Sequence, residues 1–213
     1  MGQYRYRDTT SDFIWDSWEQ EYPEPEDIIF WAPLYNLVKF IVDSDDNEFE
    51  DYIFQYFDFN SAVDYYIFLN LIKGCDNTGK NTYLARYDTN YTFLYIPWDM
   101  DGTWGRNWDQ SIVGYTGILT NNLYDRVLNT NSNDFKSEVS NRWGLLRKNE
   151  LTIKNIISGI EAYKNKFIKC GAIDRENKRW ENADLNLEEE FNMAKDWINN
   201  RIAYLDNYFI NLE

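Results

Sequence analysis

The sequence predicts a mainly α-helical protein with one small antiparallel β-hairpin, an α+β arrangement. Apolar residues recur with the 3.6-residue period of an amphipathic helix through most of the chain after Pro33. Near the middle, two short runs of aromatic and branched residues flank a cluster of turn formers, which is typical of a hairpin. Hydrophobic residues make up 44% of the 213 residues and aromatic residues 18%, enough to bury the core of one ordinary domain.

Three helices are expected before the hairpin, after an irregular segment at residues 1–32. The first begins at Pro33, because proline suits the first turn of a helix. A second, short helix covers residues 48–57. A third follows Asn60, a residue type that favours the N-cap position, and ends at Gly74.

The predicted hairpin joins residues 82–87 to residues 92–96 through a turn centred at residues 89–90. Residues 101–120 contain four glycines and little periodicity, so a long loop is expected there. Long loops in compact domains often carry function. The chain is expected to end in four helices, at residues 123–128, 134–147 and 153–168 and after Asn186, which forms a capping box with Glu189.

Composition excludes several classes of function. The formal net charge is −15, from 21 Lys and Arg against 36 Asp and Glu, so no nucleic-acid partner is expected. The chain contains no histidine, and so it offers no Ser-His-Asp or Cys-His catalysis and no His-ligated zinc. Its chemistry must therefore use carboxylates, amides, hydroxyls or a hard cation.

Cysteine spacing and hydropathy add two limits. Cys75 and Cys170 lie far apart without CxxC spacing, so one long-range disulfide and two free thiols both remain open. No run approaches the roughly 20 apolar residues of a membrane span, so none is expected. Residues 1–8 also lack the apolar stretch of a signal peptide.

Acidic and amide residues flank the predicted hairpin on both sides. Asp76 and Asn81 form a D-x-x-x-x-N pattern directly before the first strand, and Asp99 and Asp101 directly follow the second. With the turn at residues 89–90, Asn81 faces the residue before Asp99 across the ladder, about 5 Å away. We therefore expect Asn81 and Asp99 to lie side by side, with Asp76 on the loop beneath them.

Converging carboxylate and amide oxygens suit Mg²⁺ or Mn²⁺, which keep several waters and borrow phosphate oxygens. The order also matches protein kinases, in which a catalytic-loop Asp precedes an Asn by five positions and a later Asp holds the metal. Here the corresponding order is Asp76, Asn81 and Asp99.

These motifs have competing interpretations. Asp76, and likewise Asp99 with Asp101, could simply be turn residues. The D-M-D-G-T run from Asp99 resembles the nucleophile motif of haloacid-dehalogenase-type phosphatases, but that fold needs more strands than the helical remainder of the chain offers. An EF-hand loop starting at Asp99 fails because Trp104 and Gln110 occupy its Gly and Glu positions.

Several segments together resemble the spore-coat CotH kinase family, from about residue 50 to the C-terminus. The most specific is Pro-Trp-Asp-Met-Asp-Gly-Thr-Trp-Gly at residues 97–105, downstream of the Asp76–Asn81 loop. Weaker similarities lie at residues 64–70, 122–126, 142–147, 197–201 and 205–206.

The resemblance implies an atypical protein-kinase-like fold that transfers phosphate from ATP to Ser or Thr of a protein substrate, using Mg²⁺ or Mn²⁺. By the same resemblance, Asp76 is the catalytic acid, Asn81 and Asp99 are metal ligands, and Asp101 is an auxiliary ligand. The loop 101–120 would stand where kinases place an activation segment. Many members are spore-coat or extracytoplasmic bacterial proteins, which is the localisation implied here.

One departure from the family pattern is expected to matter. No Gly-rich loop followed by a strand Lys precedes Pro33, so residues 33–213 resemble a C-terminal lobe, and residues 1–32 would be a remnant of the connection to a missing N-terminal lobe. Weak or no turnover is expected of such a fragment, because phosphoryl transfer needs charge neutralisation from both sides.

A second interpretation belongs to another class of protein. Trp98, Trp104, Trp108 and Tyr115 cluster around the long loop and could form a platform for a glycan or a peptide, as in a non-catalytic cell-surface or coat module. A catalytically silent relative used in adhesion or coat assembly is a third. Oligomeric state cannot be predicted from the sequence.

Overall fold

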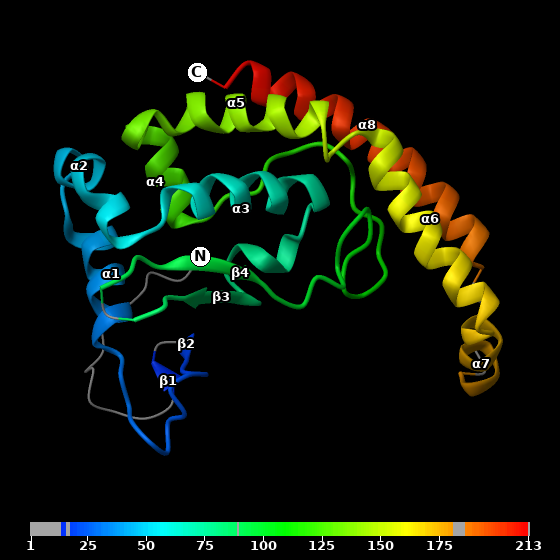
Figure 1. Cartoon of the computed structure of the whole chain (residues 1–213), viewed down its shortest axis with the longest axis horizontal. Helices are drawn as coiled ribbons and strands as arrows, with labels where there is room; N and C mark the ends of the chain where they lie inside the picture. The colour runs from blue at the N-terminus through cyan, green and yellow to red at the C-terminus, as the bar shows by residue number, and fades with distance from the viewer. Residues whose placement is uncertain (1–13, 16–17, 89, 181–185, 213) are drawn as a thin grey trace.

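The computed structural model describes residues 14–15, 18–88, 90–180 and 186–212 (Figure 1). The helices in this part of the chain are α1 (Ala32–Asp43), α2 (Asp46–Tyr56), α3 (Phe59–Ile72), α4 (Asn122–Thr130), α5 (Phe135–Lys148), α6 (Ile153–Lys169), α7 (Ala172–Arg179) and α8 (Leu187–Ile210). Two 3₁₀ turns are η1 (Cys75–Thr78) and η2 (Ser132–Asp134). The strands are β1 (Ile14–Trp15), β2 (Trp18–Glu19), β3 (Thr82–Ala85) and β4 (Leu94–Pro97).

Helix α3 is the centre of the core, because nine of its fourteen residues are buried. Its N-cap is Asp58, whose carboxylate accepts a hydrogen bond from the Ser61 amide at 2.7 Å. The prediction that Asn60 caps this helix is therefore wrong. Asn60 already lies in the first turn, whereas Asp58 has the extended backbone that a cap requires. At the other end, Lys73 takes a left-handed conformation and stops the helix.

Aromatic rings fill the space between α3 and the helices that cover it. The Tyr66 ring lies 4.9 Å from the Tyr124 ring of α4 and 6.0 Å from the Phe135 ring of α5. Tyr124 is fully buried and its hydroxyl donates to the Ala62 carbonyl at 2.9 Å, so the phenol has a partner. The high aromatic content of the sequence is therefore largely a core property.

The hairpin packs on the opposite side of α3 from α5 and α8 (Figure 1). β3 and β4 pair in the predicted register, with Thr82 opposite Pro97 and Ala85 opposite Leu94. Tyr95 of β4 stacks on Tyr65 of α3 at 4.3 Å between ring centroids, which attaches the hairpin to the core. The predicted turn centre includes residue 89, which lies outside the described residues.

The remaining predicted helices are confirmed to within a few residues, and Asn186 caps α8 as expected, accepting from the Glu188 and Glu189 amides. The sequence did not predict α7, nor the two-residue ladder β1–β2 inside the segment expected to be irregular. After Pro97 the described chain forms only an isolated bridge between Arg106 and Ile112 besides helices. The extra strands of a haloacid-dehalogenase-type fold are therefore missing from the described residues.

Helices α6 and α7, with the first half of α8, extend from the body as an arm (Figure 1). Neither α6 nor α7 has a buried residue. The two cysteines are free thiols, with Cys170 exposed near the arm's end and Cys75 partly buried in η1. None of the described helices combines the length and apolar character that a membrane crossing needs.

Candidate functional site at the open end of the hairpin

Asn81 and Asp99 lie side by side where the hairpin meets its flanking loops. Asn81 immediately precedes β3, Asp99 follows β4, and the Asn81 side-chain amide donates to Asp99 Oδ2 at 3.4 Å. The juxtaposition predicted from the hairpin register is therefore confirmed. Both residues have left-handed backbones, with φ of 50° and 48°. Asn and Asp tolerate this conformation better than most residues, and it is enriched at functional sites.

Asp76 lies in η1, the short turn that links α3 to the hairpin. Its side chain is 30% exposed, and Lys80 Nζ lies 3.8 Å from its Oδ2. This pair is weak, because the Lys80 side chain is 75% exposed and solvent screens the interaction. Asp76 therefore keeps an accessible carboxylate, with an exposed cation beside it, on the same turn that leads into Asn81.

Asn77, to which the sequence assigned no role, connects the two flanks of the hairpin through hydrogen bonds. Its side chain is 2% exposed, and its amide donates to the Trp98 carbonyl at 2.7 Å and the Asn81 carbonyl at 3.2 Å. The Asn77 carbonyl in turn accepts from the Tyr65 and Thr82 hydroxyls. One buried amide thus connects the loop before β3 to the loop after β4. In the sequence, the only sign of this role is that Asn77 stands next to Asp76 in a polar turn.

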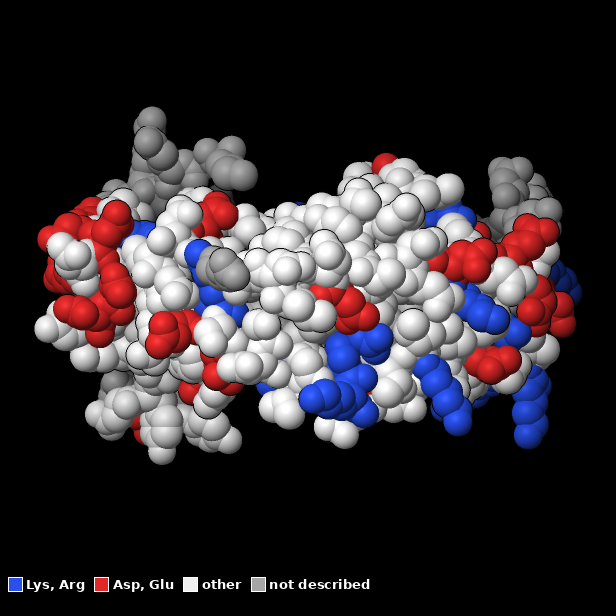
Figure 2. Space-filling model, turned by 90° about the horizontal axis from the view of Figure 1, so that it is seen from above, with Lys and Arg blue, Asp and Glu red and all other residues white. Residues whose placement is uncertain are grey.

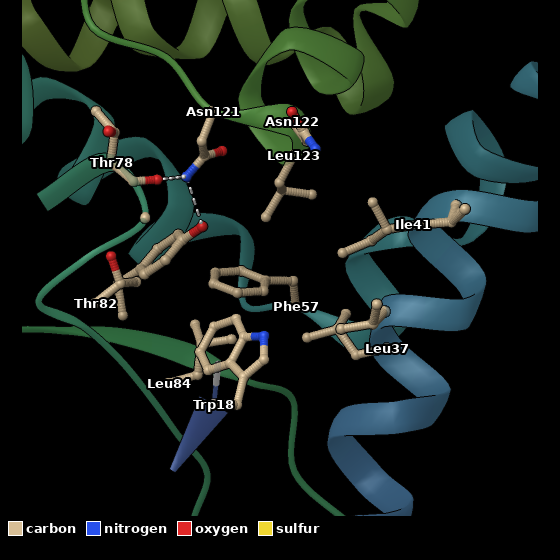
Figure 3. Close-up of a pocket in the computed structure, with 14 residues that line it drawn as sticks. Trp18, Leu37, Ile41, Phe57, Thr78, Thr82, Leu84, Asn121, Asn122 and Leu123 are labelled. Carbon is tan, nitrogen blue, oxygen red and sulfur yellow. Dashed lines mark hydrogen bonds between the residues drawn. The ribbon is translucent and has the colours of Figure 1, made fainter. Parts of the chain in front are cut away.

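The underside of the same turn rests on helix α4 (Figure 3). The amide of Asn121, the N-cap of α4, donates to the Thr78 carbonyl at 3.2 Å and lies 3.4 Å from the Tyr95 hydroxyl. Beside these groups is a mostly apolar pocket, lined by Trp18, Leu37, Ile41, Phe57, Leu84 and Leu123 among others. The turn that carries Asp76 is therefore connected to the start of α4 by one amide, and an apolar pocket lies beside it.

Two cations anchor the long loop that follows Asp99. Lys73 Nζ donates to the carbonyls of Gly114 and Thr116. Arg201, completely buried in α8, donates to the Tyr115 and Gly117 carbonyls at 2.8 and 2.7 Å. The expected loop is thus present, and hydrogen bonds from these two side chains to its main-chain carbonyls hold it in place.

Arg201 also binds the last turn of α3. Its Nε and Nη2 donate to the Asn70 carbonyl, while the Asn70 side chain exchanges two hydrogen bonds with the Leu119 main chain. Among the described residues no carboxylate pairs with Arg201, and burial lowers the pKa of its guanidinium to about 10. The sequence interpretation missed both residues, since nothing in the local pattern distinguishes a buried arginine from a surface one.

The tryptophans assigned to a binding surface occupy different environments. Trp98 and Trp108 are 55% and 65% exposed, and the Trp98 ring lies 5.0 Å from the Tyr83 ring. Trp104 is partly buried against the core, and its amide donates to the Ile72 carbonyl at 2.9 Å. Trp104 therefore does not share the exposure of the other two.

Asp101 is exposed, and the chain turns back on itself immediately after it. Gly102 is required there, because a Cβ at this position would come within 2.9 Å of the Trp108 main-chain nitrogen. Thr103 closes the turn, with its hydroxyl donating to the Met100 carbonyl at 2.9 Å. Asp101 is thus an exposed carboxylate two residues after Asp99, at the start of a tight turn.

The donor set at the hairpin suits a hard divalent cation. Asp99 and Asn81 offer a carboxylate and an amide oxygen, and Asp101 a further exposed carboxylate. In the structure the side-chain nitrogen of Asn81 faces Asp99. A 180° flip of the side-chain amide would exchange its nitrogen and oxygen, so that the oxygen could bind a cation held by Asp99. No group of three or more Cys, Asp or Glu side chains forms a metal cluster among the described residues. A cation here would consequently rely on water and substrate oxygens for most of its ligands.

These observations describe a mainly helical α+β protein whose hairpin brings Asn81 beside Asp99, with Asp76 on the adjoining turn. The chain matches the CotH kinase protein family over residues 4–205 and belongs to that family. The match begins well before residue 50, where the resemblance was expected to start, and it includes most of the segment 1–32. No curated protein matches the chain.

Proposed function

We propose that this protein transfers the γ-phosphate of ATP to a Ser or Thr hydroxyl of a protein substrate. The observation that carries the proposal is the Asn81–Asp99 contact at the open end of the hairpin, with Asp76 on the turn that leads into it. Membership in the CotH kinase family supports the same reaction class. The fold of residues 33–213 would then correspond to the C-terminal lobe of a kinase-like enzyme.

Each residue has a distinct role in this proposal. Asp76 accepts a hydrogen bond from the acceptor hydroxyl and orients it, or takes its proton, while Lys80 provides a positive charge near the phosphates. Asn81 and Asp99 would hold Mg²⁺ or Mn²⁺, with Asp101 as an additional ligand. Held by these residues, such an ion would supply positive charge to the phosphate oxygens. Asn77 keeps the two metal-binding segments in register.

The family's association with the spore coat suggests an extracytoplasmic or coat location for this protein too. The acceptor protein should therefore be sought in that compartment. The acceptor is a protein with accessible Ser or Thr residues.

The first test measures Mn²⁺ binding, which does not require turnover. Paramagnetic Mn²⁺ added with ATP to the full chain should broaden the NMR signal of the Asn81 side-chain amide. In Asp99→Ala this broadening should be strongly reduced. The matched control is Asp88→Ala, because Asp88 lies at the far end of the same hairpin and bonds only locally to the Asn90 amide. Broadening that persists unchanged in Asp99→Ala would show that Asp99 is no ligand.

The second test measures phosphate incorporation from labelled ATP into the protein itself or a coat extract with Mg²⁺ or Mn²⁺. Asp76→Ala and Asp99→Ala should each reduce incorporation by at least about 100-fold, the usual contribution of an acid–base group. Asp88→Ala should leave it unchanged. Equal incorporation by all three variants would refute the assigned roles.

A further inference from the structure

The arm formed by α6 and α7 carries an unusual combination of charge and exposed apolar surface. Residues 153–180 contain seven Lys or Arg and three Asp or Glu, in a chain whose net charge is −15. Four large apolar side chains there are 47% to 64% exposed, namely Tyr163, Phe167, Ile168 and Trp180. Clustered exposed apolar side chains next to uncompensated charge indicate an interaction surface.

Several cations of the arm have no anionic partner in the part of the chain that the structure describes. Among the described residues, no carboxylate lies within ion-pair distance of Lys166, Lys169 or Lys178, and all three are exposed. Two of the three glutamates in the first turn of α8 are already engaged, since Glu188 pairs with Lys164 at 2.8 Å and Glu190 pairs with Arg106 at 2.7 Å. The arm therefore offers free positive charge to another molecule.

The opposite end of the molecule has the complementary character. Residues 43–51, from the end of α1 into α2, contain six Asp or Glu and no Lys or Arg. Exposed apolar side chains border them, with Val42 at 49%, Tyr52 at 47% and Tyr56 at 36% exposure. Glu50 and Asp51 have no cationic partner among the described residues. Figure 2 shows acidic side chains gathered at the α2 end, whereas in the middle and at the other end Lys and Arg side chains lie among acidic ones.

The two surfaces cannot meet within one chain, because the arm and α2 lie at opposite ends of the long axis (Figure 1). We propose that the arm of one copy binds the α2 surface of a second copy. Such a contact joins two different surfaces and so is heterologous. It either propagates as a head-to-tail chain or forms twice between two antiparallel copies.

The expected association is weak, and it should be stronger at about 0.15 M salt than at about 1 M salt. The contact joins small surfaces and belongs in the size class of transient interfaces, below about 1,200 Å². Two copies of charge −15 repel at long range, but at about 0.15 M salt the Debye length is near 8 Å, so this repulsion is screened while close opposite charges still attract. At about 1 M salt the close pairs weaken as well.

The test compares charge reversals at the two ends by sedimentation velocity over a range of concentrations, with circular dichroism to verify folding. The arm variant is Lys166→Glu with Lys169→Glu, and the α2 variant is Glu50→Lys with Asp51→Lys. Each reversal places like charges in the contact, so each variant alone should need at least tenfold higher concentration to associate than the unchanged chain. Mixing the two variants should restore association, because each reversed surface then meets a complementary one.

The matched control is Lys80→Glu with Lys148→Glu, which makes the same charge change at exposed positions outside the arm and outside the α2 surface. It should associate like the unchanged chain. The proposal is overturned if the unchanged chain stays monomeric up to about 100 µM, a range in which weak specific contacts form. It is also overturned if folded variants fail to restore association on mixing, or if the arm binds anionic lipid vesicles while the chain remains monomeric.

Discussion

The buried side-chain amide of Asn77 donates a hydrogen bond to the main-chain carbonyl of Trp98 at 2.7 Å. The two residues are 21 positions apart, on opposite flanks of the hairpin. This contact fixes the spacing between the turn that carries Asp76 and the segment that carries Asp99. The proposed catalytic acid and metal ligand therefore depend on one amide that has no direct part in the chemistry.

Asn77→Ala should destabilise the fold and also loosen the site. Removal of the amide leaves the Trp98 and Asn81 carbonyls without this partner, which typically costs about 1–3 kcal/mol. Urea denaturation measures the change, with the exposed Asn90→Ala of the hairpin turn as control. Asn77→Ala should also weaken the Mn²⁺ effect on Asn81. Unchanged stability would mean that the amide is not needed to hold the two flanks together.

The cap of α3 gives a direct test of a corrected prediction. Asp58→Ala should lower the free energy of unfolding by about 1 kcal/mol, since the Ser61 amide loses its acceptor. Asn60→Ala should change stability by less than about 0.5 kcal/mol, as expected for an exposed helical position. Thermal and urea unfolding of the two variants compare them. A larger loss for Asn60→Ala than for Asp58→Ala would contradict the observed cap.

Arg201→Met should be among the most destabilising single substitutions in this protein. The side chain is completely buried and joins the Asn70 carbonyl to the Tyr115 and Gly117 carbonyls. Loss of several charge-assisted hydrogen bonds should cost about 3 kcal/mol or more. Lys195→Met, at an exposed position on the same helix, is the control. Proteolysis within residues 114–117 should increase in Arg201→Met if this arginine anchors the loop.

Stability should fall in alkaline solution, because three buried tyrosines resist ionisation in the folded chain. Burial raises the pKa of Tyr65 to about 12 and the pKa values of Tyr66 and Tyr124 still further. The stabilisation from these phenols is complete below pH 10, the model-compound value, and is lost as pH rises towards 12, because only the unfolded chain ionises. Arg201 has the opposite effect on the free energy of unfolding, which it raises with pH from about pH 10 upward, because its guanidinium loses its proton more readily in the folded chain. One arginine opposes three tyrosines, so the net change is a loss of stability.

The alkaline effect is measured as the free energy of urea unfolding between about pH 9 and pH 12, together with tyrosinate absorbance. Tyr65→Phe should reduce the slope with pH, whereas Tyr87→Phe, 88% exposed, should not. A stability that stays constant through this range would show that these phenols ionise as readily in the folded protein as in the unfolded one.

Substitutions of the exposed Trp108 and of Asp99 distinguish a binding module from an enzyme. If the protein is a glycan- or peptide-binding module, Trp108→Ala should abolish affinity for that ligand while Asp99→Ala leaves it intact. If it is a phosphotransferase, Asp99→Ala should be the damaging change and Trp108→Ala should matter little for Mn²⁺–ATP binding. Isothermal titration with each variant separates the two. Trp104 is unsuitable for this test, because its partial burial against the core couples binding to stability.

The hairpin shows how far local patterns can carry a site prediction. Turn formers and β-branched residues indicated the two strands, and the register followed from where the turn was centred. That register alone placed Asn81 beside Asp99, as the structure confirms. Asp76 was placed on the adjoining turn, but its surroundings, including Lys80, could not be derived from spacing.

The residues that hold the site in place could not be predicted in the same way. Asn77, Asn121 and Arg201 act through contacts with carbonyls 21 to 131 positions away in the chain. Any polar side chain in a loop or helix has the same local pattern whether it faces solvent or a distant carbonyl. The N-cap of α3 was misassigned for a related reason, since Asp58 and Asn60 are both good caps and only the packed backbone selects one.

By itself, the amino-acid sequence determined the helices other than α7, the hairpin and the acidic character of the chain, because periodicity, caps and turn formers act over a few neighbouring residues. Tertiary structure alone decided which polar groups are buried, which tryptophans stay exposed, and that α6 and α7 project as an arm. Those outcomes depend on which surfaces are removed from water when distant segments pack. Burial is a property of the whole fold, and no short segment of sequence contains it.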